Sequence, residues 1–344
     1  MAENIDILVI GAGPGGLACA TLLAQQGANV ALVERKAFIG PKVCAGGITW
    51  GGLIKHVPPG LIERGFPQQH VITRLQRVVV AETNPIIATI SRERLGQWMA
   101  DQAREAGVTI LTQTRALALE KHRVILETGD RSRRTLGFDH LVGADGSHSL
   151  VRRFLGLPTT AMGIGLNCML PCRHQQMEWH LHTGRFGYGY GWIFPHAEVV
   201  SIGAYGDVNN LSARVLKQRL LSWAAERGFQ LDPAAMRAGW VNFDYRGVRF
   251  DRTWLVGDAA GLASGLTGEG IYPALVSGQA VARMILDPKY PATEMIGLAN
   301  KHRRHRRIVD LAARQRPLCG LMLEILAVLL RLKILDFRIL EMAE

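Results

Sequence analysis

The stretch that decides the fold is IDILVIGAGPGG, which occupies residues 5–16. Its first half is a short apolar run rich in β-branched residues, and this composition predicts a strand. Its second half reads G-x-G-x-x-G, and the helix formers of residues 17–26 follow at once. A second strand is predicted at residues 29–33, with Glu34 at its end. This succession of strand, glycine-rich turn, helix, strand and acid predicts a dinucleotide-binding unit.

Each glycine of the turn has a physical reason. Gly11 allows the tight turn, Gly13 lets the backbone approach a pyrophosphate, and Gly16 lets the helix pack close to the sheet. The helix N-terminus adds free N–H groups and positive potential for the phosphates. Glu34 stands where a carboxylate can accept both ribose hydroxyls, and its charge would repel a 2′-phosphate. The turn therefore predicts FAD or NAD as the ligand, and not NADP.

Length and composition limit the number of domains and the class of protein. The chain has 344 residues, enough for two domains or for one large domain with an insertion. Its hydrophobic (48%) and charged (20%) fractions exclude disordered and fibrous proteins. The most apolar run, near residues 318–335, is interrupted by Glu324, Arg331 and Lys333 and is too short to form a transmembrane helix. The first residues lack the positive start of a signal peptide, so we expect a cytoplasmic protein.

The net charge of +11 raises the hypothesis of a nucleic-acid partner. The excess is concentrated in residues 301–316, where seven lysines and arginines stand against one aspartate. No zinc-finger spacing or RNA-binding strand accompanies this segment, so we expect no nucleic-acid partner. A basic helix followed by the apolar segment 318–342 is typical of an element that rests on a membrane surface. The alternative is a solvated helix followed by one that packs on the protein's own core.

The five cysteines are an odd and sparse set, which excludes a disulfide scaffold and favours a reducing compartment. They lack the spacing of an iron–sulfur site. His180 and His182 share a face of a predicted strand but have no evident third ligand. We therefore expect no metal.

Two later segments select FAD over NAD. Residues 143–153 read GADGSHSLVRR, and residues 253–261 read TWLVGDAAG, a short strand followed by a turn. With the glycine-rich turn, they resemble the DGxxSxVR and GDAAG motifs of the FAD-dependent p-hydroxybenzoate-hydroxylase-like flavoproteins. The motifs stand in the same order as in that family and cover roughly residues 1–290.

This resemblance implies the contacts with FAD. Asp258 would hydrogen-bond the ribityl hydroxyls, and residues 268–271 would present backbone N–H groups to the flavin at a helix start. Arg92 falls where the family has a cofactor-contacting arginine, although Gly96 stands where relatives often have an aspartate. Glu269 is expected to be structural, and Asp145 and Arg152 to hold their motif together. The cofactor-binding residues predicted are Gly11, Gly13, Gly15, Gly16, Glu34, Arg35, Cys44, Ala45, Gly47, Arg92, Ala116, Asp145, Asp258, Gly268, Gly270 and Ile271.

Two further segments indicate which family of flavoproteins the sequence resembles. Residues 39–48 read IGPKVCAGGI, and residues 189–195 read GYGWIFP. They resemble the P-x-x-C-G-G-like loop and the Y-x-W-x-F-P strand of the geranylgeranyl reductase family, with Ala45 where many relatives have glycine. The resemblance implies that the loop approaches the cofactor and that the strand's aromatic side chains, which share one face, wall a substrate cavity. An ordinary core strand is the alternative. The catalytic residues predicted are Cys44, Tyr190 and Trp192, with Phe194 as a further wall residue.

The reaction implied is hydride transfer from reduced FAD to an isolated double bond of a prenyl chain. The proton would come from a thiol, a tyrosine or an ordered water. The electron donor is left open between NADPH and ferredoxin, because no second nucleotide-binding fingerprint is present. Two alternatives stay open: an aromatic monooxygenase on the same scaffold, and a membrane-docked flavin electron carrier that is not an enzyme.

The fold class expected is α/β, with a Rossmann-like FAD-binding domain, an inserted antiparallel β-sheet domain for the substrate, and a helical C-terminal tail. We assign the FAD-binding domain to residues 1–70, 88–160 and 246–300. The substrate domain would take residues 71–87 and 161–245, and the C-terminal helical region residues 301–344. The partners expected are a prenyl-chain lipid and an electron-donor protein, with a peripheral membrane surface as a further possibility.

Overall fold

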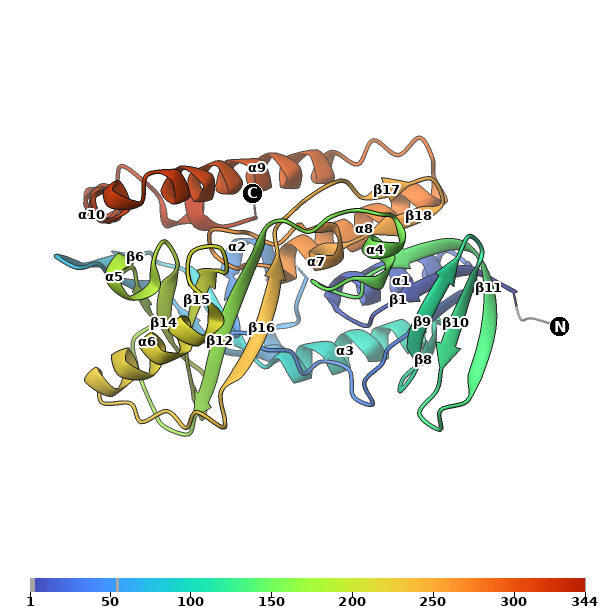
Figure 1. Cartoon of the computed structure of the whole chain (residues 1–344), viewed down its shortest axis with the longest axis horizontal. Helices are drawn as coiled ribbons and strands as arrows, with labels where there is room; N and C mark the ends of the chain where they lie inside the picture. Colours follow the sequence, from blue (N-terminus) through green and yellow to red (C-terminus); the bar gives the residue numbers. More distant parts are fainter. Residues whose placement is uncertain (1–3, 54–55, 344) are drawn as a thin grey trace.

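The computed structural model describes residues 4–53 and 56–343, and Figure 1 shows their arrangement. The first large sheet is the one that the opening stretch predicts. It has the strand order β17-β18-β11-β1-β2-β8, and the hairpin strands β9 and β10 extend it from β11. Its strands are β1 (Asn4–Ile10), β2 (Val30–Val33), β8 (Thr109–Leu111), β9 (Arg115–Glu120), β10 (Arg123–Glu127), β11 (Arg133–Gly143), β17 (Arg249–Phe250) and β18 (Thr253–Leu255).

The centre of this sheet is parallel. β1 pairs in parallel with β2 and β11, and β18 pairs in parallel with the end of β11. Parallel strands bring their carboxyl ends to one edge of the sheet, where doubly wound folds bind ligands. The glycine-rich turn after β1, the Asp145 turn after β11 and the Asp258 turn after β18 therefore meet at that edge. The three motifs, far apart in the sequence, thus form one site.

Helix α1 (Pro14–Gln25) begins in the glycine-rich turn and packs beside α8 (Ile271–Leu286) and α3 (Arg92–Glu105). Its residues share an apolar core with the strands, including Leu17, Leu23 and Val9. Glycines allow the close helix contact: a Cβ at Gly278 would lie 2.2 Å from the Gly15 carbonyl oxygen. The short helices α4 (Leu150–Phe154) and α7 (Gly257–Ala260) follow β11 and β18.

The second large sheet has seven strands in the order β16-β12-β15-β14-β13-β5-β6. These are β5 (Gln68–Ile72), β6 (Arg77–Ala81), β12 (Met162–Leu170), β13 (Glu178–His180), β14 (Tyr190–Pro195), β15 (Val200–Asp207) and β16 (Arg237–Asn242). It is antiparallel as predicted, except that β13 pairs in parallel with β5. Helices α5 (Thr183–Phe186) and α6 (Ala213–Glu226) cover one face, where Leu216, Leu220 and Trp223 are buried. The other face carries the aromatic side chains of β14.

A small third sheet joins the two parts. It consists of β3 (Gly47–Thr49), β7 (Ile87–Ile90) and β4 (Ile62–Phe66), in that order. The short helix α2 (Trp50–Leu53) and the 3-10 turn η1 (Pro59–Leu61) lie between β3 and β4 in the sequence. β3 continues the loop that carries Cys44, so pairing of β3 with β7 holds one end of that loop.

The chain closes with α9 (Thr293–Arg314), α10 (Arg316–Arg331) and the 3-10 turn η2 (Phe337–Leu340). Figure 1 shows α9 alongside α8, with α10 at the far end of α9, next to β6 of the seven-stranded sheet. The last described residues fold back under α9, and Lys301 donates to the backbone oxygens of Glu341 and Ala343. Within the described ranges, no helix is both long and apolar enough to cross a membrane.

Candidate functional site

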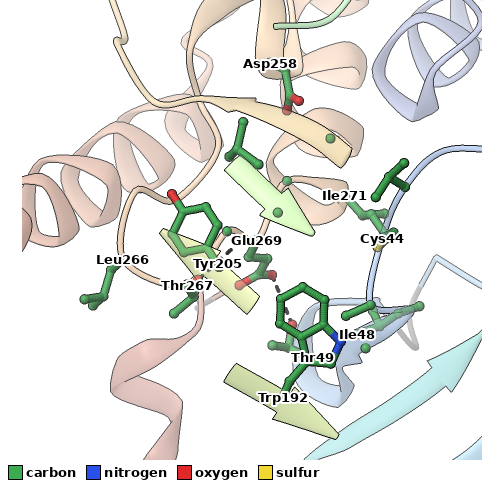
Figure 2. Close-up of a pocket in the computed structure, with 18 of the residues that line it drawn as sticks. Cys44, Ile48, Thr49, Trp192, Tyr205, Asp258, Leu266, Thr267, Glu269 and Ile271 are labelled. Atoms are coloured by element: carbon green, nitrogen blue, oxygen red, sulfur yellow. Dashed lines mark hydrogen bonds between the residues drawn. The ribbon is translucent and has the colours of Figure 1, made fainter. Parts of the chain in front are cut away.

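A cavity of about 260 Å³ lies where the two large sheets, the third sheet and the C-terminal tail meet. One end is lined by Gly13, Gly15, Arg92 and Asp258, and the other by Trp179, Tyr190, Phe194, Leu323 and Leu326. Figure 2 shows Asp258 on one side of this space and Trp192 on the other, with Glu269 between the rings of Trp192 and Tyr205. The cavity therefore joins the predicted nucleotide cradle to an apolar chamber.

The glycine-rich turn has the geometry that its sequence predicts. Gly11 has a φ of +106°, and a Cβ there would lie 2.4 Å from the carbonyl oxygen of Ala144. A Cβ at Gly16 would lie 2.1 Å from the carbonyl oxygen of Gly11, so only glycine permits this packing. A Cβ at Gly13 would have only that Ala144 oxygen nearby, at 3.9 Å, and it would face the cavity. Gly13 thus leaves open the space through which a phosphate group would approach.

Glu34 lies at the end of β2, next to the turn. Its Oε2 accepts from the backbone N–H of Ala12 at 3.0 Å, and Oε1 accepts from that of Lys36 at 3.0 Å. The carboxylate is thereby held in place, and each oxygen keeps a lone pair for a ribose hydroxyl. Arg35 follows it, and Ala116 lies on β9; these two residues, like Glu34 itself, are not among the described residues that line the cavity. Their contact with a cofactor stays a prediction.

Asp258 lies at the start of α7 and is nearly buried. Its Oδ2 accepts from the Lys42 ammonium at 3.0 Å and from the Ser147 hydroxyl at 3.1 Å. Asp145 plays a different part, because its Oδ2 accepts the backbone N–H groups of Leu150 and Val151 at the start of α4. Burial raises the pKa of Asp145. Asp145 therefore holds its turn together, and it is not among the described residues that line the cavity, so its contact with a cofactor stays a prediction. Asp258 does line the cavity.

Arg92 is the clearest sign that a polar ligand belongs here. Ser91 caps α3 by accepting from the Arg94 backbone N–H, which puts Arg92 in the first helical turn, with its side chain lining the cavity. Its Nε and Nη1 are buried, and no described residue accepts a hydrogen bond from either. Buried donors are almost always paired, so this guanidinium calls for a ligand with acceptor oxygens. The residues present fit a dinucleotide such as FAD.

The loop that carries Cys44 is held from three sides. The Asn167 side chain donates to the Cys44 carbonyl oxygen at 2.7 Å, and the His196 ring bonds the Ala45 carbonyl oxygen through Nε2 at 3.0 Å. The other ring nitrogen of His196 bonds Glu63 at 2.5 Å. A Cβ at Gly96 would lie 2.2 Å from the Gly40 Cα atom. Glycine at position 96 thus lets the loop pack directly on α3.

The aromatic strand β14 faces the cavity with Tyr190, Trp192 and Phe194. The Tyr190 hydroxyl donates to the Thr267 carbonyl oxygen at 2.5 Å, and burial raises its pKa. The Trp192 indole donates to the Ser201 hydroxyl at 3.0 Å. These bonds satisfy the polar atoms of both rings, so the rings offer the cavity chiefly apolar surface.

The turn that precedes α8 closes the cavity from the side of the first sheet. Gly268 has a φ of +70°, and α8 begins at Ile271 with Gly270 as its N-cap. The Glu269 side chain points into the space between the sheets, where Oε1 accepts from the Thr49 hydroxyl at 3.3 Å, shown dashed in Figure 2. Oε2 accepts from the Met342 backbone N–H at 2.8 Å. The C-terminal tail thus contacts this turn.

Several residues of the site have no signal in the sequence motifs. Lys42 stands inside the Cys44 loop, and its pairing with Asp258 depends on two segments separated by 216 positions. Asn167 and Ser201 lie on adjacent strands, and they read as ordinary strand residues in the sequence. Glu341 lies beyond the last motif and lines the cavity only because the tail folds back. For Asn167, the sequence signal is a polar residue within an otherwise apolar strand.

Comparison with known proteins agrees with this geometry. A family model described as an FAD binding domain matches residues 4–285. Digeranylgeranylglycerophospholipid reductase 2 of Methanopyrus kandleri is 30% identical over 311 residues, covering 80% of this chain and 75% of its own. The chloroplastic geranylgeranyl diphosphate reductase of Nicotiana tabacum is 27% identical over 325 residues, with 86% and 68% covered. A geranylgeranyl bacteriochlorophyll reductase-like protein from Thermoplasma acidophilum has the same fold, with a TM-score of 0.75 at 21% identity over 99% and 92% of the two chains.

Proposed function

This chain belongs to the geranylgeranyl reductase family of FAD-dependent oxidoreductases, and we propose that it saturates isolated double bonds of a prenyl chain. The observation that carries the proposal is the single cavity that reaches from Gly13 and Arg92 to Leu323 and Leu326. A flavin held by the first pair and an apolar chain held against the second pair would share one continuous space. Relatives named as reductases of geranylgeranyl compounds support the same substrate class.

The residues that would hold FAD follow from the site. The open face of Gly13 and the N-terminus of α1 would bind the pyrophosphate, Glu34 the adenosine ribose, and Asp258 the ribityl chain. Arg92 would supply its two unpaired donors to acceptor oxygens of the cofactor. When bound and reduced, FAD supplies a hydride.

The protein's own part is to bind, orient and exclude water. An isolated alkene accepts a hydride poorly, so the double bond must be held close to the donor in a dry site. Trp179, Tyr190 and Phe194 pack ring against ring along one wall, with Trp179 and Phe194 centroids 4.7 Å apart. Leu323 and Leu326 of α10 line the same end of the cavity, and Leu326 packs against this aromatic cluster. This surface suits the flexible hydrocarbon of a prenyl chain better than it suits a small polar ring.

The outer face of α10 favours a membrane-bound form of that substrate. Leu318, Leu321, Ile325, Val328 and Leu332 recur at spacings of three and four residues and are 39–60% exposed. The opposite face of the same helix lines the cavity. We refer to these five residues as the outer face of α10.

The charges near this face support a membrane as the surface that it contacts. Arg314, Arg331 and Lys333 flank this face in the sequence and are exposed, whereas Glu324 is turned away and accepts hydrogen bonds from Thr73 and Gln76. An apolar helix face bordered by cations matches the interface of a bilayer that contains anionic lipids. We therefore propose that the outer face of α10 rests on such a bilayer, from which a prenyl lipid reaches the cavity.

One anaerobic experiment tests the function. Protein reduced with dithionite is incubated with a geranylgeranyl lipid, and the molecular mass of the product is measured by mass spectrometry. We expect a gain of two hydrogens for each double bond reduced. No gain across several prenyl lipids would overturn the proposal. Oxygen-dependent consumption of NAD(P)H with an aromatic compound would favour the monooxygenase, and reoxidation by an acceptor protein without any product would favour the electron carrier.

The purified protein in its oxidised form distinguishes between the two candidate electron donors, NADPH and ferredoxin. NADPH or reduced ferredoxin is mixed anaerobically with the oxidised flavoprotein, and loss of the visible flavin absorption is followed with time. The physiological donor is the one that bleaches the flavin at least as fast as the alkene is reduced.

A further inference from the structure

The cavity holds a pair of acidic side chains that the FAD contacts do not use. Glu269 comes from the turn before α8, and Glu341 comes from the C-terminal tail; both line the cavity. They are separated by 72 positions in the sequence, and the tail brings them together when its Met342 N–H donates to Glu269 at 2.8 Å. A Cβ at Gly51 would lie 3.8 Å from Oε2 of Glu341, which places this second carboxyl against α2.

Saturation of an alkene requires a proton as well as a hydride, and the structure narrows the choice of proton donor. The Tyr190 hydroxyl already donates its only proton to the Thr267 carbonyl oxygen, and burial makes the phenolate costly. Glu269 keeps a carboxyl group in the same chamber, between the rings of Trp192 and Tyr205 (Figure 2). On geometry, Glu269 is the acid available to a chain that lies along the aromatic wall.

We propose that Glu269 is the general acid that protonates the double bond, and that Glu341, the second carboxyl of the cavity, is its positioning residue. This inference rests on the proposed reductase function. The π electrons of the alkene form one C–H bond with the Glu269 proton, and the O–H bond breaks to leave a carboxylate. The other C–H bond takes its hydride from reduced flavin. Water restores the proton when the product leaves.

The surroundings of the pair support a carboxyl that is protonated near neutral pH. Burial raises the pKa of Glu269 to about 7, although hydrogen bonds from Met342 and Thr49 and the charge of Lys301 lower it. Burial and then the charge of Glu269 raise the pKa of Glu341 to about 7. Two neighbouring acids with pKa values of about 7 titrate as a coupled pair, so part of the pair carries a proton near neutral pH.

The groups that face the pair come from several elements. They are Thr49 of β3, Tyr190 of β14, Lys301 of α9, and Asp336 and Arg338 of the tail. Lys301 directs two hydrogen bonds to backbone oxygens of the tail, so part of its charge serves to hold the tail in place.

The test combines three variants that keep the shape of the site. Glu269→Gln should bind FAD and be reduced by dithionite like the wild type, yet lose about 100-fold or more of alkene reduction, the usual contribution of a general acid. Wild-type activity should fall as pH rises through about 7. The charge of Glu269 raises the pKa of Glu341, and the coupling of two acids is mutual, so Glu341→Gln should move this fall to lower pH. Thr49→Val removes a hydrogen bond to the carboxylate, so the fall should move to higher pH.

Opposite shifts of this kind would not arise from a merely structural role. Glu226→Gln is the matched control, since Glu226 is exposed on α6 and pairs with Arg185 away from the cavity; its profile should not move. Cys44→Ser tests the rival donor. Loss of activity in Cys44→Ser, with full activity in Glu269→Gln, would overturn the proposal in favour of the thiol.

A measurement that needs no substrate separates this inference from the reductase function. Infrared difference spectra of the FAD-bound protein, recorded across neutral pH, should show the carbonyl band of a neutral carboxylic acid that disappears as pH rises. The band should be weakened or absent in Glu269→Gln. If the wild type shows the band and yet reduces no prenyl lipid, the reductase function fails. If the wild type reduces the lipid and the band is missing, Glu269 is not the acid.

Discussion

The side-chain amide of Asn167 donates a hydrogen bond of 2.7 Å to the carbonyl oxygen of Cys44, across 123 positions of sequence. The same amide nitrogen contacts the Ser201 hydroxyl, which also accepts from the Trp192 indole. One buried amide thus ties the loop beside the nucleotide cradle to the aromatic wall of the cavity.

We therefore expect Asn167→Ala to affect both stability and turnover. The carbonyl oxygen of Cys44 loses its side-chain donor, which costs about 1–3 kcal/mol of unfolding free energy when the group stays buried. Urea denaturation measures this loss, and the alkene assay should show lower kcat with FAD still bound. Asn209→Ala, in the exposed turn after β15, is the control and should leave kcat unchanged. Unchanged stability in Asn167→Ala would show that the loop does not depend on this bond.

Two glycines of the same turn should fail in different ways. A Cβ at Gly13 would lie 3.9 Å from the Ala144 carbonyl oxygen, an ordinary contact, so Gly13→Val should fold and yet block the approach of a dinucleotide. A side chain at Gly16 would overlap the Gly11 carbonyl oxygen at 2.1 Å, so Gly16→Val should not fold stably. Circular dichroism measures folding and visible absorption measures bound flavin. A yellow Gly13→Val protein would contradict the assignment of Gly13 to the cofactor.

Arg92 should show opposite effects on stability and on cofactor binding. Two of its buried nitrogens have no acceptor among the described residues, and such groups cost roughly 1–3 kcal/mol each. Arg92→Met keeps much of the side-chain length and removes the charge. We expect the FAD-free protein to melt at a higher temperature and the Kd for FAD, followed by flavin fluorescence, to rise. A lower melting temperature together with an unchanged Kd would show that Arg92 serves the fold alone.

The buried acid Glu269 should make stability depend on pH. Its pKa is about 7 in the folded protein against an ordinary value of 4.5, so the folded state holds the proton more tightly than the unfolded chain does. Unfolding free energy must then fall as pH rises from about 4.5 to 7. Glu269→Gln should flatten this slope and be the more stable protein above pH 7, by up to about 3 kcal/mol. Urea midpoints measured across this range check the sign.

The outer face of α10 should bind bilayers that carry negative charge. We expect the wild type to sediment with vesicles of phosphatidylcholine and phosphatidylglycerol, and much less with phosphatidylcholine alone. Leu321→Glu with Ile325→Glu puts two carboxylates on exposed positions, so binding should be lost while the fold and the bound FAD persist. Val79→Glu, an exposed apolar residue of β6, is the control. Equal sedimentation of both variants with anionic vesicles would exclude this helix face.

The sequence predicted most of the fold. The strand, turn and helix of residues 5–26 appear as β1 and α1, and the three cofactor motifs meet at one sheet edge as parallel pairing requires. These features are predictable because they are local in the sequence or follow from parallel strand pairing. At Gly11 and Gly16, for example, neighbouring backbone atoms leave no room for a side chain. The predicted helix of the basic segment exists, but α9 starts earlier, at Thr293.

The amino-acid sequence alone thus determined a chain that binds a dinucleotide between glycine-rich turns and presents an aromatic strand. Only the tertiary structure decided which side chains from other parts of the chain contact these features. The pairing of Lys42 with Asp258, the bond from Asn167 to Cys44, and the meeting of Glu269 with the tail each join segments far apart in the chain. Such contacts depend on how the sheets and the tail pack against one another. Local propensity and motif spacing act along the chain, so they do not determine the distance between side chains from separate segments.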